Sequence, residues 1–274
     1  MKLSADELRP LLKNERFPRS EAYDPVWVLE NEMGPSALWL TEWLCEEMEF
    51  EPGMRVLDMG CGKAMSSVFL AKEFGVRVWA NDLWIPASEN WQRICEAGVT
   101  DLVCPIHAEA HDLPYAEGFF DAIVCVDAYN YFGTDDLYLG YFSKFVRPGG
   151  QLGIVVPALM REFKDGPPEY MTREQSNGKR WWDPAVCFSF HTCAWWERHW
   201  KQTELVDIEV ADTLVEGWCD WLQFEEAKNA ADTNRWPEEA EVLRADEGLY
   251  LGFARLVARK RAEQAEKLST HAEA

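Results

Sequence analysis

The chain has 274 residues, and its 27 Lys and Arg against 48 Asp and Glu give a formal net charge of −21 at pH 7. A negative field of this size repels phosphate backbones and anionic lipid headgroups, so we expect neither a nucleic-acid-binding nor a membrane-surface protein. The hydrophobic fraction of 47% and the aromatic fraction of 13% exclude a disordered chain and allow a large core.

The cysteines indicate a reducing compartment. Eight are scattered along the chain, and no two of them form a C-x-x-C pair. The first residues lack a basic segment followed by an apolar run, and no stretch approaches the length of a membrane span. We therefore expect a cytoplasmic protein, whose oligomeric state the sequence leaves open.

The predicted elements alternate between strands and helices. The first 22 residues are polar and predict a mobile or loosely docked arm, and residues 35–48 have the apolar spacing of an amphipathic helix. Strands are expected at 55–58, 76–80, 102–106, 120–126 and 151–156, and helices at 66–74, 89–97 and 135–146. This alternation favours parallel βαβ units in a sheet that is covered on both faces.

The pattern changes after residue 157. A segment rich in Trp, Pro and charge follows, and strands are expected again at 205–215 and 249–259, paired antiparallel at one edge of the sheet. We predict one α/β domain made of an N-terminal arm and helix (1–48), a ligand-binding core (49–157), an aromatic insertion (158–202), the C-terminal part of the same sheet with a helical insertion (203–260) and a polar tail (261–274).

A glycine-containing turn follows the first predicted strand. Asp58 lies at the carboxyl end of that strand, and Gly60 and Gly62 let the backbone approach a ligand before the next helix begins. Asp82 follows 24 residues after Asp58, an offset at which an acidic residue binds ribose hydroxyls. The alternative is a plain strand–turn–helix, and the spacing does not separate a nicotinamide cofactor from another adenosine compound. A G-x-G-x-x-G turn would require glycine where Met65 stands.

Five motifs resemble those of class I S-adenosylmethionine-dependent methyltransferases. The first resembles E/D-x-G-x-G-x-G, with Ala64 in place of the third glycine. The second, Asn81-Asp82, is similar to the acidic residue that ends the second strand in this family. The third resembles G-D-A-x-x-L-P-F, with Glu109 in place of Asp. The fourth is similar to the family's fourth-strand motif, which lies beside the reactive methyl group. The fifth matches the K/R-P-G-G turn that precedes the fifth strand. They lie, in this order, at 58–64, 81–82, 107–115, 120–129 and 147–150.

The resemblance implies a Rossmann-like seven-stranded, mostly parallel sheet in the order 3-2-1-4-5-7-6, with helices on both faces, an N-terminal helical lid and an aromatic-rich cap. It implies S-adenosyl-L-methionine as cofactor and a small-molecule acceptor, for which the acidic charge and the tryptophans favour an amine or another polar metabolite. The implied cofactor-binding residues are Asp58, Gly60, Cys61, Gly62, Asp82, Leu83, Glu109, Ala110 and Asp127.

Three other functions stay open. The chain could bind S-adenosylmethionine without catalysis, act as a nicotinamide oxidoreductase, or modify lipids as a cyclopropane-synthase-like enzyme. The last of these requires a basic lipid-facing surface, which the net charge does not favour.

The catalytic prediction centres on the end of the fourth strand. Some small-amine methyltransferases have an Asp there in an S-R-D-x-x-x-H stretch, and Asp127 stands at the corresponding place. Val126 replaces the Arg and Tyr131 replaces the His, so the resemblance does not carry over an intact acid–base pair. We expect Asp127, Tyr131 and Tyr23 to be catalytic; the alternative for Asp127 is a cap on the following turn.

The aromatic insertion is expected to cover the substrate. We predict substrate contacts from Tyr129, His191, Trp195 and Trp196, and the alternative is that these side chains form a small core at the sheet edge. The arm residues expected to cover the cofactor are Tyr23, Trp27, Asn31, Glu32 and Met33.

We expect no metal site. His107 and His111 lack the H-E-x-x-H pattern, and Cys187, His191 and Cys193 lack a nearby fourth ligand.

Overall fold

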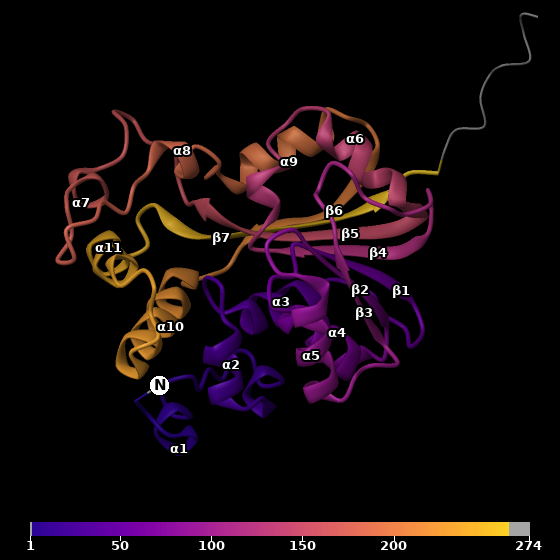
Figure 1. Cartoon of the computed structure of the whole chain (residues 1–274). Helices are drawn as coiled ribbons and strands as arrows, with labels where there is room; N and C mark the ends of the chain where they lie inside the picture. The colour runs from indigo at the N-terminus through magenta and orange to yellow at the C-terminus, as the bar shows by residue number, and fades with distance from the viewer. Residues whose placement is uncertain (1, 263–274) are drawn as a thin grey trace, which may run out of the picture.

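The computed structural model describes residues 2–262, which form one seven-stranded sheet with helices on both faces (Figure 1). The strand order is β3-β2-β1-β4-β5-β7-β6, in which β1 to β5 are parallel and β7 runs antiparallel to both β5 and β6. The strands are β1 (Arg55–Met59), β2 (Arg77–Asp82), β3 (Val103–His107), β4 (Phe120–Val126), β5 (Val146–Leu159), β6 (Val206–Thr213) and β7 (Leu251–Lys260). The predicted fold class and sheet order are confirmed; residues 263–274 of the predicted tail lie outside the described part.

Two elements differ most from their predicted bounds. β5 extends beyond 151–156 because it pairs with β7 from Gln151, opposite Arg259, to Leu159, opposite Leu251. The helix expected at 135–146 is reduced to α6 (Tyr138–Phe142) and a 3₁₀ turn at Ser143–Phe145. Gly140 and a run of aromatic residues in this segment have low helix propensity, which accounts for the short helix.

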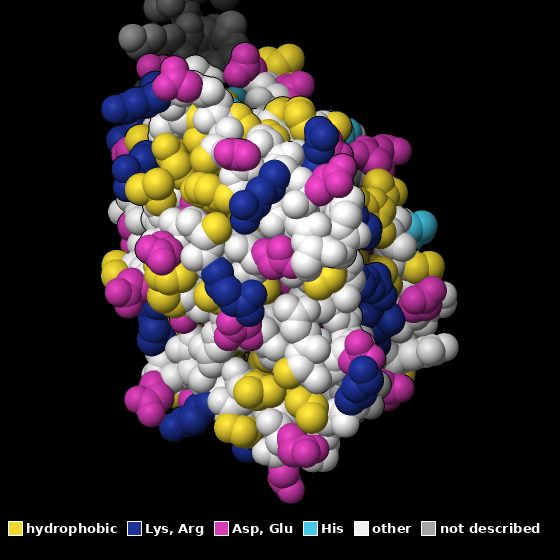
Figure 2. All heavy atoms as spheres, turned by 90° about the vertical axis from the view of Figure 1, so that its left-hand side faces the viewer, with side chains coloured by type: hydrophobic (Ala, Val, Ile, Leu, Met, Phe, Trp, Pro, Cys, Tyr) yellow, Lys and Arg dark blue, Asp and Glu magenta, His cyan; other side chains and the backbone are white. Residues whose placement is uncertain are grey.

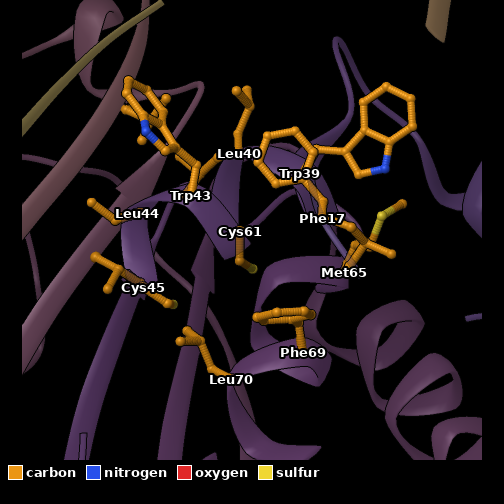
Figure 3. Close-up of a cluster of buried hydrophobic side chains, with 14 of the residues drawn as sticks. Phe17, Trp39, Leu40, Trp43, Leu44, Cys45, Cys61, Met65, Phe69 and Leu70 are labelled. Carbon is orange, nitrogen blue, oxygen red and sulfur yellow. The ribbon is translucent and has the colours of Figure 1, made fainter. Parts of the chain in front are cut away.

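One face of the sheet is covered by N-terminal helices. They are α2 (Pro25–Asn31), α3 (Ala37–Cys45), α4 (Met65–Phe74) and α5 (Ala87–Ala97). Asp24 caps α2 by accepting hydrogen bonds from two backbone N–H groups, and Ser36 caps α3. Apolar side chains of α3, such as Trp39, belong to the same buried cluster as Met65 and Phe69 of α4 (Figure 3). This packing fixes α3 and α4 beside the carboxyl end of β1.

The opposite face is covered by α6 and α9 (Cys193–Lys201) (Figure 1). Trp196 and Trp200 of α9 are fully buried, and their rings lie 5.7 and 5.5 Å from that of Tyr129. The structure thus corrects the expectation for this part of the insertion 158–202: α9 is a layer on β6 and β7, with its tryptophans in the core. The remaining helices of the insertion are α7 (Glu169–Thr172) and α8 (Pro184–Cys187).

The N-terminal arm is docked, which corrects the expectation of a mobile segment. Leu8 at the end of α1 (Ala5–Leu8) and Phe17 are buried. Asp220 accepts a hydrogen bond from Asn14 Nδ2 and forms an ion pair with Arg16 Nη1, each at 2.8 Å. Asp220 belongs to α10 (Gly217–Ala231), which α11 (Glu238–Asp246) follows, so the N-terminal arm is anchored to a helix from the C-terminal part of the chain. The arm also contains a 3₁₀ turn at Ser20–Ala22.

The surface mixes charge signs. Figure 2 shows the side of α7, α10 and α11, where acidic and basic side chains are interspersed with hydrophobic ones. Within residues 2–262, no helix combines the length and the apolar character that a membrane span requires.

Candidate cofactor and acceptor site

A cavity of about 300 Å³ lies where the carboxyl ends of β1, β2 and β4 meet. In an open α/β sheet this edge is where ligands bind. The walls come from five segments of the chain. They are the strap between α2 and α3 (residues 32–36), the glycine loop after β1, and the loops after β2, β3 and β4. Their lining residues include Met33, Gly34, Gly60, Cys61, Gly62, Asp82, Leu83, Trp84, Glu109, Ala110, Asp127 and Tyr131.

The glycine loop packs between the loop after β4 on one side and the strap on the other. Gly60 and Gly62 have φ values of 72° and 53°. A Cβ atom on Gly60 would lie 2.4 Å from that of Ala128, and one on Gly62 would lie 2.9 Å from Met33 Sδ. Glycine is therefore required at both positions, for backbone conformation and for space. Ala64 also has a positive φ, of 63°, so the position of the third motif glycine keeps its backbone conformation.

Asp58 lies behind the loop and does not line the cavity. Its Oδ2 accepts hydrogen bonds of 2.6 Å from the hydroxyls of Ser66 and Ser67, whereas Oδ1 is buried and lacks a partner among the described residues. Burial raises the pKa of Asp58 to about 6, although both hydroxyls oppose the rise. The free oxygen is an acceptor for a donor that enters from the ligand side.

Asp82 joins the second strand to the glycine loop. One carboxylate oxygen accepts from the N–H of Gly62 at 2.8 Å, and the other accepts from the N–H groups of Trp84 and Ile85 at 2.7 and 2.9 Å. These bonds fix the carboxylate at the cavity wall, where its remaining lone pairs can accept from hydroxyl groups. The neighbouring loop holds Glu109, whose carboxylate is bonded to His111; this hydrogen bond lowers the pKa of Glu109.

Asp127 directly follows β4 and faces the strap. Its φ is 55°, a left-handed conformation that Asp tolerates better than most residues, and its N–H bonds to the Val155 carbonyl at 2.8 Å. A Cβ atom on Gly34 would lie 2.4 Å from Asp127 Oδ2. Burial raises the pKa of Asp127 to about 8; Glu239 adds to the rise and Lys228 opposes it. Tyr131, also at the cavity, is half exposed.

Five predicted site residues lie elsewhere, which corrects their expected placement. Tyr23 lines a separate hollow beside α1 and α2, and its hydroxyl donates to Glu73 at 3.2 Å. Tyr129 and Trp196 are buried core residues on the other face of the sheet. His191 stacks on Trp195, with 3.7 Å between ring centroids, and neither lines the cavity. Helical spacing of aromatic residues predicts burial but not which face receives them.

The histidine and cysteine groups considered for metal have other surroundings. His107 Nε2 lies 2.7 Å from the Leu83 carbonyl oxygen, and all eight cysteines are free. Among residues 2–262, no three potential ligands are arranged to hold a metal ion.

Sequence reasoning missed several residues around the cavity. Trp84 follows Asp82 and Leu83 in the sequence, a position that could have drawn attention to it. Lys228 and Glu225 of α10 form a buried ion pair of 2.5 Å behind the strap, and no sequence signal connects them to the cavity.

Comparison with known proteins agrees with this geometry. Residues 56–150 match the family model of a methyltransferase domain. Methyltransferase GfsG of Streptomyces halstedii is 32% identical over 116 residues, which cover 42% of each chain. Sarcosine/dimethylglycine N-methyltransferase of Halorhodospira halochloris is 29% identical over 116 residues, again 42% of each chain. The matched region thus spans less than half the length of these relatives.

The fold has solved counterparts. The [4+2]-cyclase SpnF has a TM-score of 0.64 at 18% identity, with 85% of each chain covered. Geranyl diphosphate methyltransferase, solved with GPP and sinefungin, has a TM-score of 0.61 at 19% identity, with 80% of this chain and 76% of that chain covered. Residues 56–150 therefore correspond to a methyltransferase domain, and the chain shares the fold of these solved structures.

The residues at the cavity fit S-adenosylmethionine, the cofactor that the sequence resemblance implies. Gly60 and Gly62 leave room for a ligand against the backbone, Asp58 offers a buried free acceptor behind the glycine loop, and Asp82 and Glu109 line the cavity. S-adenosylmethionine has an ammonium, ribose hydroxyls and an adenine amino group, all of which are donors suited to these acceptors.

Proposed function

We propose that this protein transfers a methyl group from S-adenosylmethionine to the nitrogen of a small-molecule amine. The observation that carries this proposal is Asp127. Its carboxylate lies at the cavity, at the carboxyl end of β4, and accepts no hydrogen bond from the described residues. A carboxylate that the protein leaves unpaired in a ligand cavity is suited to hold a cationic or hydrogen-donating group.

The chemistry requires alignment and the removal of one proton. S-adenosylmethionine supplies an electrophilic methyl group on a positively charged sulfur. The acceptor nitrogen forms the new N–C bond with its lone pair as the S–C bond breaks and leaves its electrons on sulfur. Asp127 orients the nitrogen and accepts the proton that the amine loses.

The surroundings of Asp127 tune it for this role. Its pKa of about 8 lies near neutral pH, where a general base is most effective. A bound cation favours the ionised carboxylate, so an incoming ammonium lowers this pKa. The protein's net charge of −21 also draws cations toward it. One of the similar proteins acts, by its name, on the amines sarcosine and dimethylglycine.

The test is a radiolabelled methyl-transfer assay over a panel of amines, alcohols, thiols and carboxylates. We expect label in amines, and we expect Asp127→Asn to reduce kcat about 100-fold or more, because positioned acid–base groups contribute about 10²–10⁴-fold. The dissociation constant of S-adenosylhomocysteine should stay nearly unchanged, which serves as the control. Transfer only to non-amines would contradict the proposal, and cofactor binding without any transfer would favour the non-catalytic alternative.

A further inference from the structure

The cavity opens through an apolar mouth that the proposed chemistry does not use. Trp84 and Tyr131 line the cavity from different loops, and their ring centroids are 6.0 Å apart. Nevertheless, Trp84 is 67% and Tyr131 52% exposed. Single exposed apolar residues are common, but adjoining aromatic rings at the opening of a ligand cavity are typical of a binding surface.

The apolar surface continues toward α8. Asn130 Nδ2 donates to Ser189 Oγ at 3.4 Å, which joins the Tyr129–Tyr131 turn to the segment after α8. The turn that carries Tyr131 and the segment after α8 are therefore neighbours in the fold. On this segment Val186 and Phe188 are 43% and 59% exposed. Large apolar side chains are therefore exposed both beside Tyr131 and on the neighbouring α8 segment.

The interior of the cavity adds a carboxylate to buried apolar side chains such as Met59 and Val126. Asp127 lies at the inner wall, and Glu239 is near enough to affect its ionisation. A ligand that spans the cavity from inside to outside would meet a carboxylate first and aromatic rings last. Such an arrangement matches a molecule with a polar head and an apolar body.

We propose that the methyl acceptor is an amphiphilic amine, whose nitrogen lies at Asp127 and whose apolar body lies on Trp84 and Tyr131. This inference rests on the proposed amine methylation and adds the chemical class of the substrate. In this proposal Trp84 determines specificity, because the affinity for the acceptor depends on how much of its apolar chain Trp84 and Tyr131 cover.

The test measures binding separately from turnover. The full-length protein, saturated with S-adenosylhomocysteine, is titrated calorimetrically with n-alkylammonium ions from propyl to octyl. We expect the dissociation constant to fall about two- to fourfold for each added methylene, because each one is removed from water. In Trp84→Ala this dependence should flatten. Trp91→Ala is the matched control, because Trp91 is 45% exposed on α5 and does not line the cavity.

The outcomes separate the two proposals. Equal affinity for all chain lengths would overturn the inference that the mouth binds an apolar chain, even if short amines were methylated at normal rates. A weaker affinity for S-adenosylhomocysteine in Trp84→Ala, with an unchanged alkylammonium series, would assign Trp84 to the cofactor and also overturn it. Chain-length-dependent binding that Trp84→Ala abolishes supports the inference, and a methyl-transfer assay on the same ions then decides the proposed function.

Discussion

Lys228 Nζ donates a hydrogen bond of 3.2 Å to the carbonyl oxygen of Gly34. The same ammonium pairs with Glu225 at 2.5 Å and with Glu32 at 3.7 Å, and all three side chains are buried. Burial alone would lower the pKa of Lys228, but these carboxylates and Glu239 outweigh it and raise the pKa. Since Gly34 lies against Asp127, α10 holds the strap in place over the cavity.

Lys228→Met should therefore disturb both the strap and Asp127. We expect a loss of roughly 3–5 kcal/mol in the free energy of unfolding, because the buried carboxylates lose their partner. The pKa of Asp127 should rise further, since Lys228 opposes its rise. Urea denaturation measures the first effect, and the pH dependence of kcat/KM measures the second.

The double variant Lys228→Met/Glu225→Gln separates these effects. Removing one carboxylate should restore part of the stability, while the altered pH profile should persist. An unchanged profile in the double variant would show that Lys228 serves folding alone.

Gly34→Ala tests the contact between the strap and Asp127. The new methyl group would lie 2.4 Å from Asp127 Oδ2, so either the strap or the carboxylate must move. We expect kcat to fall at least tenfold, because the carboxylate shifts relative to the acceptor. Gly140→Ala is the control, since its nearest contact would be Leu205 Cδ1 at an ordinary 3.8 Å. Equal activity of the two variants would argue against a functional contact.

Asp82→Asn should weaken cofactor binding. The carboxylate accepts three backbone N–H groups, and the amide nitrogen of Asn would face at least one of these donors. With the loss of charge-assisted bonds to the ribose as well, we expect the affinity for S-adenosylhomocysteine to fall by roughly 2–4 kcal/mol. Calorimetry measures this loss, and thermal melting verifies folding. An unaltered dissociation constant in a folded variant would reduce Asp82 to a turn residue.

Asp127→Asn should stabilise the protein without cofactor, and more so at high pH. The folded pKa of about 8 lies above the unfolded value of about 3.9, so stability is lost as pH rises from the unfolded to the folded pKa. Because Asn does not ionise, the variant does not lose folding stability as the pH rises. We expect a gain in the free energy of unfolding of roughly 2–5 kcal/mol at pH 9, against about 1 kcal/mol at pH 5. A gain independent of pH, in urea titrations at both values, would refute the assigned pKa.

The sequence predicts the part of the site that local patterns encode. The strand–glycine–helix order places Gly60 and Gly62, and the ends of β2 and β4 place Asp82 and Asp127, because the carboxyl ends of parallel strands meet at one edge. The aromatic residues are different. Trp195, Trp196 and Trp200 have a spacing that suits a buried helix face as well as a substrate cap, and only the packing of α9 on β6 and β7 decides between them.

Long-range contacts of buried charge could not be predicted. Lys228 lies on a helix that also carries the exposed Glu226, and nothing in the local sequence distinguishes a buried charge from an exposed one. Its role depends on the strap, which comes from the other end of the chain. Similarly, Asn14 and Arg16 look like solvated arm residues until Asp220 is placed beside them.

The hydrogen bond between Lys228 and Gly34 also determines when the cavity can be completed during translation. The two residues are 194 positions apart, so the strap emerges from the ribosome long before the helix that fastens it. At about 5–20 residues per second, this interval is roughly 10–40 s. During that time the glycine loop and the ends of β1 to β4 can form, but the cavity lacks its fastened wall. Tight cofactor capture by the nascent chain is therefore delayed until α10 has been translated.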